Sequence, residues 1–194
     1  MPRQKSVVRL VSEPLLIAVV LAAGVRAAVS VYSIPTASMQ PSLKIGDHIL
    51  VTPYRWSSPA RSDVVVFRAP SDGSQLMVKR IIGLPGDLID SRAGRVRIGE
   101  HTIAEPYILK QAASGAISAQ LVPADSFYVM GDNREDSLDS RQWGTLPREM
   151  VIGRVRMVLW SSAGGDHPAQ ASTISRQDLR AARGRLSRIF KCVE

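Results

Sequence analysis

The stretch Leu76-Met77-Val78-Lys79-Arg80-Ile81-Ile82-Gly83-Leu84-Pro85-Gly86-Asp87 joins an apolar strand to a strong turn signal. Its β-branched residues favour extended structure, and glycine, proline and aspartate at its end are typical of a tight turn. Alternation along a strand predicts that Met77, Lys79 and Ile81 share one face. The sequence therefore predicts a strand that carries a lysine among apolar neighbours.

Similar short apolar segments recur on both sides of this stretch, separated by Gly, Pro and Asp turns. Further strands are predicted at Asp47–Val51, Asp63–Phe67, Arg95–Ile98, Ser126–Met130 and Val151–Trp160. Many short strands at regular spacing are typical of all-β domains. The pattern predicts a mainly β fold, as a coiled antiparallel β-sheet or barrel-like domain. Residues 111–120, rich in Ala, Ser and Gly, are expected to form an exposed hairpin loop.

The only long apolar stretch, Leu15–Val25, lies near the amino terminus and follows basic residues at positions 3, 5 and 9. A spanning helix needs about 20 apolar residues, so this one requires flanking side chains that snorkel. One interpretation is a retained single-pass anchor with a cytoplasmic amino terminus. The other is a cleavable signal peptide with small residues at Ala28–Ser30, which Arg26 disfavours.

The chain is expected to have three parts: a cytoplasmic start and transmembrane helix (1–31), an extracytoplasmic domain (32–165) and a basic tail (166–194).

The net charge of +8 indicates an anionic partner. A membrane surface fits better than nucleic acid, because basic residues gather at both ends and aromatic residues are only 5%. Residues 175–190 are interpreted either as an interfacial helix or as a solvated basic tail.

Metal and cofactor chemistry is not expected. Cys192 is the single cysteine, so an intramolecular disulfide is impossible. His48, His101 and His167 are scattered, without the paired spacing of a metal site.

A second unusual segment, Ile34-Pro35-Thr36-Ala37-Ser38-Met39-Gln40-Pro41-Ser42-Leu43, follows the apolar stretch and holds Ser38 between two prolines. Proline fixes φ and restricts the residue before it, so this backbone is stiff. Stiffness suits a nucleophile, which also needs a base. A buried lysine with a lowered pKa is one such base, and Lys79 fits. The alternatives are a proline-rich exit from a helix and a solvated lysine.

A third segment, Gly131–Gly144, is dense in polar residues that bond their own backbone. Asp139 and Arg141 are expected to pair and make the loop rigid. Ser137 or Ser140 could donate to or orient a nearby amine. The alternative is an ordinary polar surface loop.

Together the three segments resemble the boxes of bacterial signal peptidase I, the Ser-Lys leader peptidase family. Ser38–Leu43 with Gly46-Asp47 resembles its serine box, and Lys79–Asp87 resembles its lysine box. Gly131–Gly144 resembles its Gly-Asp-Asn…Ser-x-Asp-Ser-Arg-x-Trp-Gly box. The order matches as well, and three boxes in order are far more specific than any one motif.

The resemblance implies a role for each matched position. Ser38 would be the nucleophile and Lys79 the general base, with Ser137 holding the lysine amine. Thr36, where the family often has serine, would assist the Ser38 N–H in the oxyanion hole. Asp139 and Arg141 would support the site. Shallow apolar pockets would be formed by Ile34, Pro35, Met39, Leu43, Met77 and Val78.

The implied function is a membrane-bound serine endopeptidase that removes signal peptides from exported preproteins. It would cleave after Ala-x-Ala patterns through an acyl-enzyme, without a cofactor. Its partners would be preproteins and the lipid bilayer, with the catalytic domain on the outer face of the inner (plasma) membrane. Alternatives are a conjugative-type maturation peptidase of the same clan, or an inactive membrane-anchored β-domain.

Overall fold

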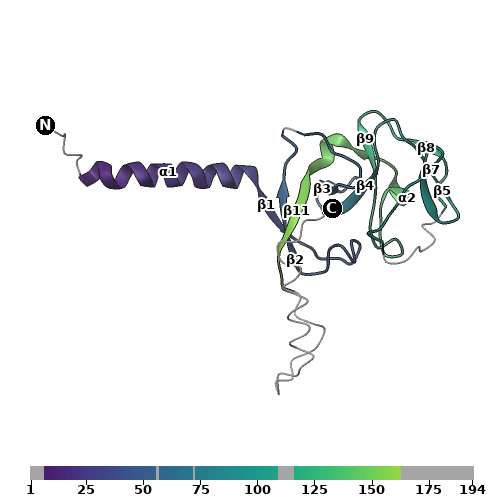
Figure 1. Ribbon diagram of the computed structural model, residues 1–194, viewed down its shortest axis with the longest axis horizontal. Helices are drawn as coiled ribbons and strands as arrows, with labels where there is room; N and C mark the ends of the chain where they lie inside the picture. Colours follow the sequence, from purple (N-terminus) through teal and green to yellow (C-terminus); the bar gives the residue numbers. More distant parts are fainter. Residues whose placement is uncertain (1–6, 56, 72, 109–115, 163–194) are drawn as a thin grey trace, which may run out of the picture. The chain divides into compact units, whose positions relative to one another are not determined.

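The computed structural model describes residues 7–55, 57–71, 73–108 and 116–162, and the chain divides into two compact units between Ser30 and Val31 (Figure 1). The helix considered for residues 175–190 lies outside the described residues, as does Cys192. Residues 111–115, half of the loop predicted at 111–120, also lie outside them.

The first unit contains one long helix, α1 (Val7–Ala28), which includes Pro14. Its large apolar side chains are mostly exposed, between 57% and 65%, at Val11, Leu15, Leu16, Ile17, Val19, Val20 and Leu21. The predicted helix is therefore present. None of the helices in the described part of the chain, however, is both long enough and apolar enough to cross a bilayer.

The second unit is built on a seven-stranded sheet in the order β1-β2-β11-β3-β4-β9-β10. Its strands are β1 (Ser30–Ser33), β2 (Asp47–Thr52), β3 (Val64–Arg68), β4 (Leu76–Gly83), β9 (Ser126–Met130), β10 (Leu146–Pro147) and β11 (Val151–Ser161). The recorded strand pairings are antiparallel. The mainly β, antiparallel prediction is confirmed.

The barrel-like part of that prediction is wrong, because the sheet is not closed. β1 and β10 lie at its two edges. β10 has only two residues, and one of them is Pro147, which has no N–H to donate to a further strand. A barrel requires that the two edge strands bond to each other. Here the short edges end the sheet instead.

The central strand β3 is buried on both faces, which explains its unbroken apolar sequence. Val64 and Val66 enter one hydrophobic cluster, while Val65 and Phe67 enter another. Alternate residues of a strand point to opposite faces, so β3 contributes to two cores at once. The neighbouring strand β4 pairs with it, with Lys79 opposite Val65. The strand that carries Lys79 is thus fixed against a strand that is buried on both faces.

A smaller sheet has the order β7-β6-β5-β8, with β5 (Leu88–Arg92), β6 (Arg95–Ile98), β7 (His101–Thr102) and β8 (Gln120–Leu121). Ala93 and Gly94 join β5 to β6, both with positive φ, as a two-residue hairpin requires. The smaller sheet shares a third hydrophobic cluster with β9, in which Ile89 and Val96 join Tyr128 and Met130. Two short helical segments, α2 (Ser140–Trp143) and η1 (Arg148–Met150), complete the described fold.

Candidate active site

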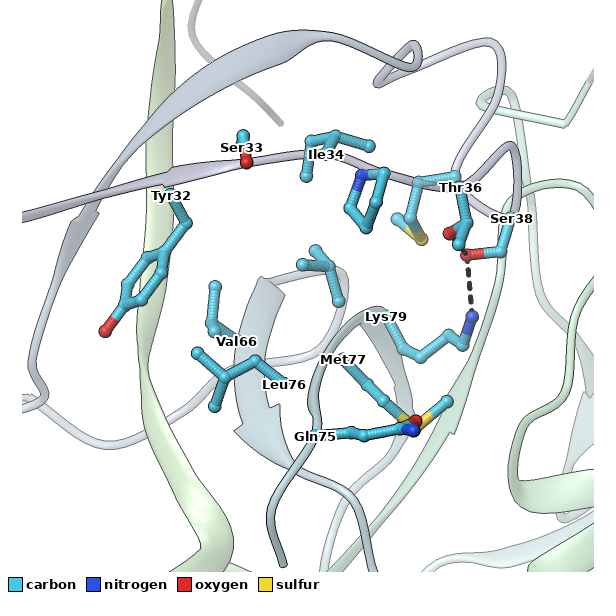
Figure 2. A pocket seen from close by; sticks show the side chains of 13 residues that line it. Tyr32, Ser33, Ile34, Thr36, Ser38, Val66, Gln75, Leu76, Met77 and Lys79 are labelled. Atoms are coloured by element: carbon cyan, nitrogen blue, oxygen red, sulfur yellow. Dashed lines mark hydrogen bonds between the residues drawn. The ribbon is translucent and has the colours of Figure 1, made fainter.

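Ser38 and Lys79 meet in the second unit, although 41 positions separate them in the sequence. The Lys79 Nζ donates a hydrogen bond to Ser38 Oγ at 2.7 Å (Figure 2). Both residues are nearly buried, with Lys79 3% and Ser38 9% exposed. The amine therefore has the hydroxyl as a direct partner and little contact with solvent.

The buried position changes the acidity of this amine. Burial lowers the pKa of Lys79 from 10.5 to about 8, because the charged form loses its hydration. Asp139, Asp136 and Asp132 act against that shift, whereas Arg141 adds to it. Roughly a tenth of the Lys79 amines are therefore neutral at pH 7. A neutral amine 2.7 Å from a hydroxyl can accept its proton.

The segment that carries Ser38 is held on both sides of the serine by buried apolar residues. Ile34, Met39 and Leu43 lie in one hydrophobic cluster, at most 3% exposed. Backbone bonds from Ile34 to the Asp47 carbonyl (2.9 Å) and from Leu43 to the Met39 carbonyl (2.9 Å) close the segment. These contacts leave the Ser38 hydroxyl little freedom to move.

The Gly131 turn (Gly131–Arg134) lies directly behind the serine. The Asn133 backbone N–H donates to the Ser38 carbonyl at 3.0 Å, and Asn133 Nδ2 donates to the Ala37 carbonyl at 3.3 Å. A Cβ on Gly131 would lie 2.5 Å from the Ser38 carbonyl oxygen and 2.2 Å from Ser137 Oγ. The turn can approach the serine only because residue 131 has no side chain.

The same turn is tied to the lysine strand by a fully buried ion pair. Arg80, next to Lys79 on β4, donates from Nε and Nη2 to Asp132 at 2.9 and 2.7 Å. Both side chains have no exposed area. Two parallel bonds of this kind fix orientation as well as distance. Arg80, Asp132 and Asn133 were not among the predicted site residues, although all three lie within the quoted segments.

Asp139 organises the loop that follows. Its side chain is fully buried and pairs with Arg141, whose Nε lies 2.8 Å from Oδ1, so the predicted pair is present. It also accepts from the Gly131 N–H at 2.9 Å and caps α2. Burial alone raises the pKa of Asp139, but the bonds from Arg141, Gly131 and Ser137 outweigh burial and leave the pKa lowered. Asp139 therefore stays ionised close to the lysine.

Two of the predicted site hydroxyl groups lie close to Ser38 or to the turn behind it. Thr36 Oγ1 is 3.4 Å from Ser38 Oγ. Ser137 Oγ donates to Asp139 Oδ2 at 2.8 Å and packs beside Gly131. The role of Ser137 as the partner of the lysine amine stays a prediction.

A cavity of about 500 Å³ opens beside Ser38 and Lys79. It lies between the segment 32–36 and the segment 75–79 (Figure 2). Of the predicted pocket residues, it is lined by Ile34, Pro35, Met39, Met77 and Val78. Leu43 is instead fully buried in the hydrophobic cluster below. Sequence reasoning missed further lining residues: Tyr32, Ser33, Val66, Gln75 and Leu76.

Comparison with known proteins gives a family for this arrangement. The family model described as "Signal peptidase, peptidase S26" matches residues 7–160. The chain belongs to the signal peptidase S26 family. It is 37% identical to a signal peptidase I of Leptolyngbya laminosa over 155 residues, which cover 74% of this chain and 75% of that protein. It is 38% identical to a probable signal peptidase I-2 of Synechocystis over 74% of this chain and 69% of the other.

Members of the S26 family are serine proteases, and signal peptidase I removes signal peptides, so this peptidase is an enzyme of that class. A signal peptidase I V of Bacillus subtilis is 31% identical over 71% of this chain and 90% of its own. A crystal structure of a signal peptidase I from Enterococcus faecalis aligns with a TM-score of 0.46 and 29% identity, over 50% of this chain and 97% of that one. Within the described residues of the peptidase, no cluster of His, Cys, Asp or Glu is arranged to hold a metal ion.

Proposed function

We propose that this signal peptidase cleaves exported preproteins with Ser38 as the nucleophile and Lys79 as the general base. The observation that carries the proposal is the 2.7 Å bond between Lys79 Nζ and Ser38 Oγ in a buried setting. A serine hydroxyl attacks well only when an adjacent base removes its proton. The lowered pKa of Lys79, about 8, supplies such a base near neutral pH. These two residues are called the catalytic pair below.

The chemical steps then follow from the positions of these atoms. Ser38 Oγ attacks the scissile carbonyl carbon while Lys79 Nζ takes the hydroxyl proton. The tetrahedral intermediate collapses, Lys79 returns that proton to the departing amine, and an ester links the preprotein's signal segment to Ser38. Lys79 then deprotonates a water molecule, which attacks the ester and releases the signal segment with a new carboxylate. Ser38 regains its proton from the lysine.

The developing oxyanion needs hydrogen-bond donors. Thr36 Oγ1, 3.4 Å from Ser38 Oγ, and the Ser38 backbone N–H are the proposed donors. A preorganised donor of this kind typically contributes about 100- to 1000-fold in rate.

The cavity supports recognition of an extended peptide with small apolar side chains. In the described strands, β9 pairs with the second half of β4, from Arg80 to Gly83, while β3 pairs with the other side of Leu76–Arg80. The first half of β4 therefore has one side toward the cavity (Figure 2). An extended segment can add to such a strand by backbone hydrogen bonds. The apolar lining suits residues such as alanine before the cleavage site.

A lipid bilayer is the proposed location of the enzyme. The exposed apolar side chains of α1 and the basic residues before it favour contact with an anionic membrane. Membrane pelleting with a carbonate wash tests this proposal, since full release by carbonate would contradict it.

The single-pass arrangement with a cytoplasmic amino terminus stays a prediction, as do the three domain limits. Protease protection tests the orientation, and a mature amino terminus near Val31 would show that the helix is removed.

The decisive experiment is preprotein cleavage by purified full-length enzyme in detergent. Ser38→Ala and Lys79→Ala are expected to abolish cleavage, and so is Lys79→Arg, because a guanidinium does not give up its proton in proteins. Ser58→Ala and Lys44→Ala, both at exposed positions, are matched controls that should cleave normally. Normal cleavage by Ser38→Ala or by Lys79→Ala would overturn the proposal.

A further inference from the structure

A short segment between two strands of the smaller sheet, Glu105-Pro106-Tyr107, contacts the arginines that lie beside the Gly131 turn. It follows β7, and its two polar side chains meet two arginines from the larger sheet and the Gly131 turn. Glu105 pairs with Arg134, accepting from Nη1 at 3.1 Å and from Nη2 at short range. The Tyr107 ring lies against Arg80, with the guanidinium carbon 4.1 Å from the ring centre. These four residues are called the arginine clamp.

The members of the clamp also bond to one another, and the side chains of Arg134, Glu105 and Arg80 are almost fully buried. The Tyr107 hydroxyl donates to Glu105 Oε1 at 3.0 Å, so the acid and the ring support each other. The side chains of Arg134 and Glu105 are 1% and 7% exposed, and that of Arg80 is fully buried. Burial raises the pKa of Tyr107, which keeps its hydroxyl protonated as a donor. Charges in such a site interact strongly because little water screens them.

Each arginine of the clamp also holds the Gly131 turn. Arg134 Nε donates to the Gly131 carbonyl at 2.9 Å. Arg80 binds Asp132 with two bonds and also donates to the Ser62 carbonyl at 2.9 Å. The turn is therefore held at its first two residues by guanidinium groups that Glu105 and Tyr107 cover.

The turn contacts the segment of the serine and the strand of the lysine. Asn133 bonds the Ser38 carbonyl at 3.0 Å, while Arg80 is the direct neighbour of Lys79 on β4. A shift of the turn would thus move the serine relative to the lysine. Misplacement of a reacting group by about 1 Å can cost 100-fold in rate.

We propose that Glu105 and Tyr107 are positioning residues. They act through Arg80 and Arg134 to hold the Ser38 hydroxyl within hydrogen-bond distance of the Lys79 amine. The inference rests on the proposed function of the catalytic pair. It assigns the smaller sheet a part in the reaction, although that sheet contributes no residue to the cavity beside the pair.

The test compares Tyr107→Leu, Tyr107→Phe and Glu105→Gln in the full-length enzyme in detergent. Phenylalanine keeps the ring over Arg80 and loses only the bond to Glu105, so Tyr107→Phe should lose much less activity than Tyr107→Leu. Tyr107→Leu should lower kcat about 10- to 100-fold with little change in KM, since the cavity itself is untouched. Its kcat/KM should also reach half-maximum at a higher pH, because a Gly131 turn displaced from the pair leaves Lys79 less buried, and loss of burial raises its pKa. Glu105→Gln should lower kcat about tenfold.

Tyr54→Leu is the matched control, since Tyr54 also donates to a carboxylate, Asp63, but follows β2. It should lower Tm without moving the pH profile. Wild-type kcat and pH profile in Tyr107→Leu would overturn the inference, as would equal losses in the Leu and Phe variants. Should Tyr107→Leu not fold, a wild-type kcat and pH profile in Glu105→Gln would overturn it. Cleavage by Ser38→Ala would instead overturn the proposed function, so the two failures are distinguishable.

Discussion

The backbone N–H of Asn133 lies 3.0 Å from the carbonyl oxygen of Ser38, and this bond joins the serine segment to the Gly131 turn. The next residue back, Asp132, is bound by the arginine beside Lys79. One short turn therefore touches the segment of the serine and the strand of the lysine. The distance between the two reacting atoms depends on the geometry of that turn.

Gly131→Ala is expected to slow cleavage strongly and lower Tm. The new Cβ would lie 2.2 Å from Ser137 Oγ and 2.5 Å from the Ser38 carbonyl oxygen, so the turn must move away from the serine. A loss of about 100-fold or more in kcat is expected. Gly24→Ala in α1 is the control, because a Cβ there meets nothing within 4 Å. An active Gly131→Ala enzyme would show that the close approach is not needed.

Thr36→Val keeps the shape of the side chain and removes the hydroxyl that lies 3.4 Å from Ser38 Oγ. If that hydroxyl stabilises the oxyanion, kcat should fall about 100- to 1000-fold while KM changes little. Thr36→Ser, which retains the hydroxyl, should keep most of the activity. Steady-state kinetics on a preprotein peptide measure both effects, and equal rates in the two variants would count against the role.

The pH dependence of kcat/KM should follow the titration of Lys79. With its pKa lowered to about 8, the rate should rise as the amine loses its proton and level off above that pH. A profile that keeps rising toward the ordinary lysine value of 10.5 would contradict a buried base.

Lys79→Met should stabilise the fold at pH 7 while it abolishes cleavage. Because the folded pKa of Lys79 is lower than the unfolded one, burial of the lysine costs stability below about pH 8. That cost, roughly 3 kcal/mol, declines as the pH rises from 8 to 10.5 and the unfolded chain also loses its proton. Urea unfolding at pH 7 and pH 10.5 should therefore show a gain at the lower pH that shrinks at the higher one. Lys44→Met, at an exposed position, should show no such pH-dependent gain.

Asp139→Asn should destabilise the fold by about 3 to 5 kcal/mol at neutral pH, because it leaves the Arg141 guanidinium without its buried anionic partner. The lowered pKa of Asp139 means that its contribution is present above the unfolded value of 3.8 and is lost as the pH falls through the folded one. The stability difference between wild type and variant should therefore shrink in strong acid. Urea unfolding at several pH values measures it, and a constant difference would contradict the lowered pKa.

The strands were largely predictable, because burial imposes a local pattern on each of them. The prediction at Ser126–Met130 matches β9, and the predicted strand at Asp63–Phe67 differs from β3 by one residue at each end. β5 was missed because Leu88–Arg92 has only two apolar residues and pairs inside a small, half-exposed sheet. The barrel-like expectation failed because sheet closure depends on whether distant edges meet, which no local pattern encodes.

For the site as well, local segments could be predicted from the sequence, whereas contacts between distant segments could not. The stiff serine segment, the lysine on an apolar strand and the polar loop could each be recognised, and their order resembled one family. Leu43 was assigned to the pocket because its position matches one at which the resembled family forms an apolar pocket, yet its side chain lies in the core. Arg80 and Asp132 lay within the recognised segments, but nothing local indicates that they bind each other across 52 positions.

The sequence by itself determined which chemical groups are available: a serine between prolines, a lysine on an apolar strand and a polar loop, since these are properties of short segments. Only the tertiary structure decided that Lys79 Nζ lies 2.7 Å from Ser38 Oγ, that burial lowers its pKa, and that the smaller sheet reaches the arginines behind the pair. Hydrogen-bond distance, loss of hydration and contact between distant segments arise when the chain packs. They are therefore properties of the folded molecule as a whole.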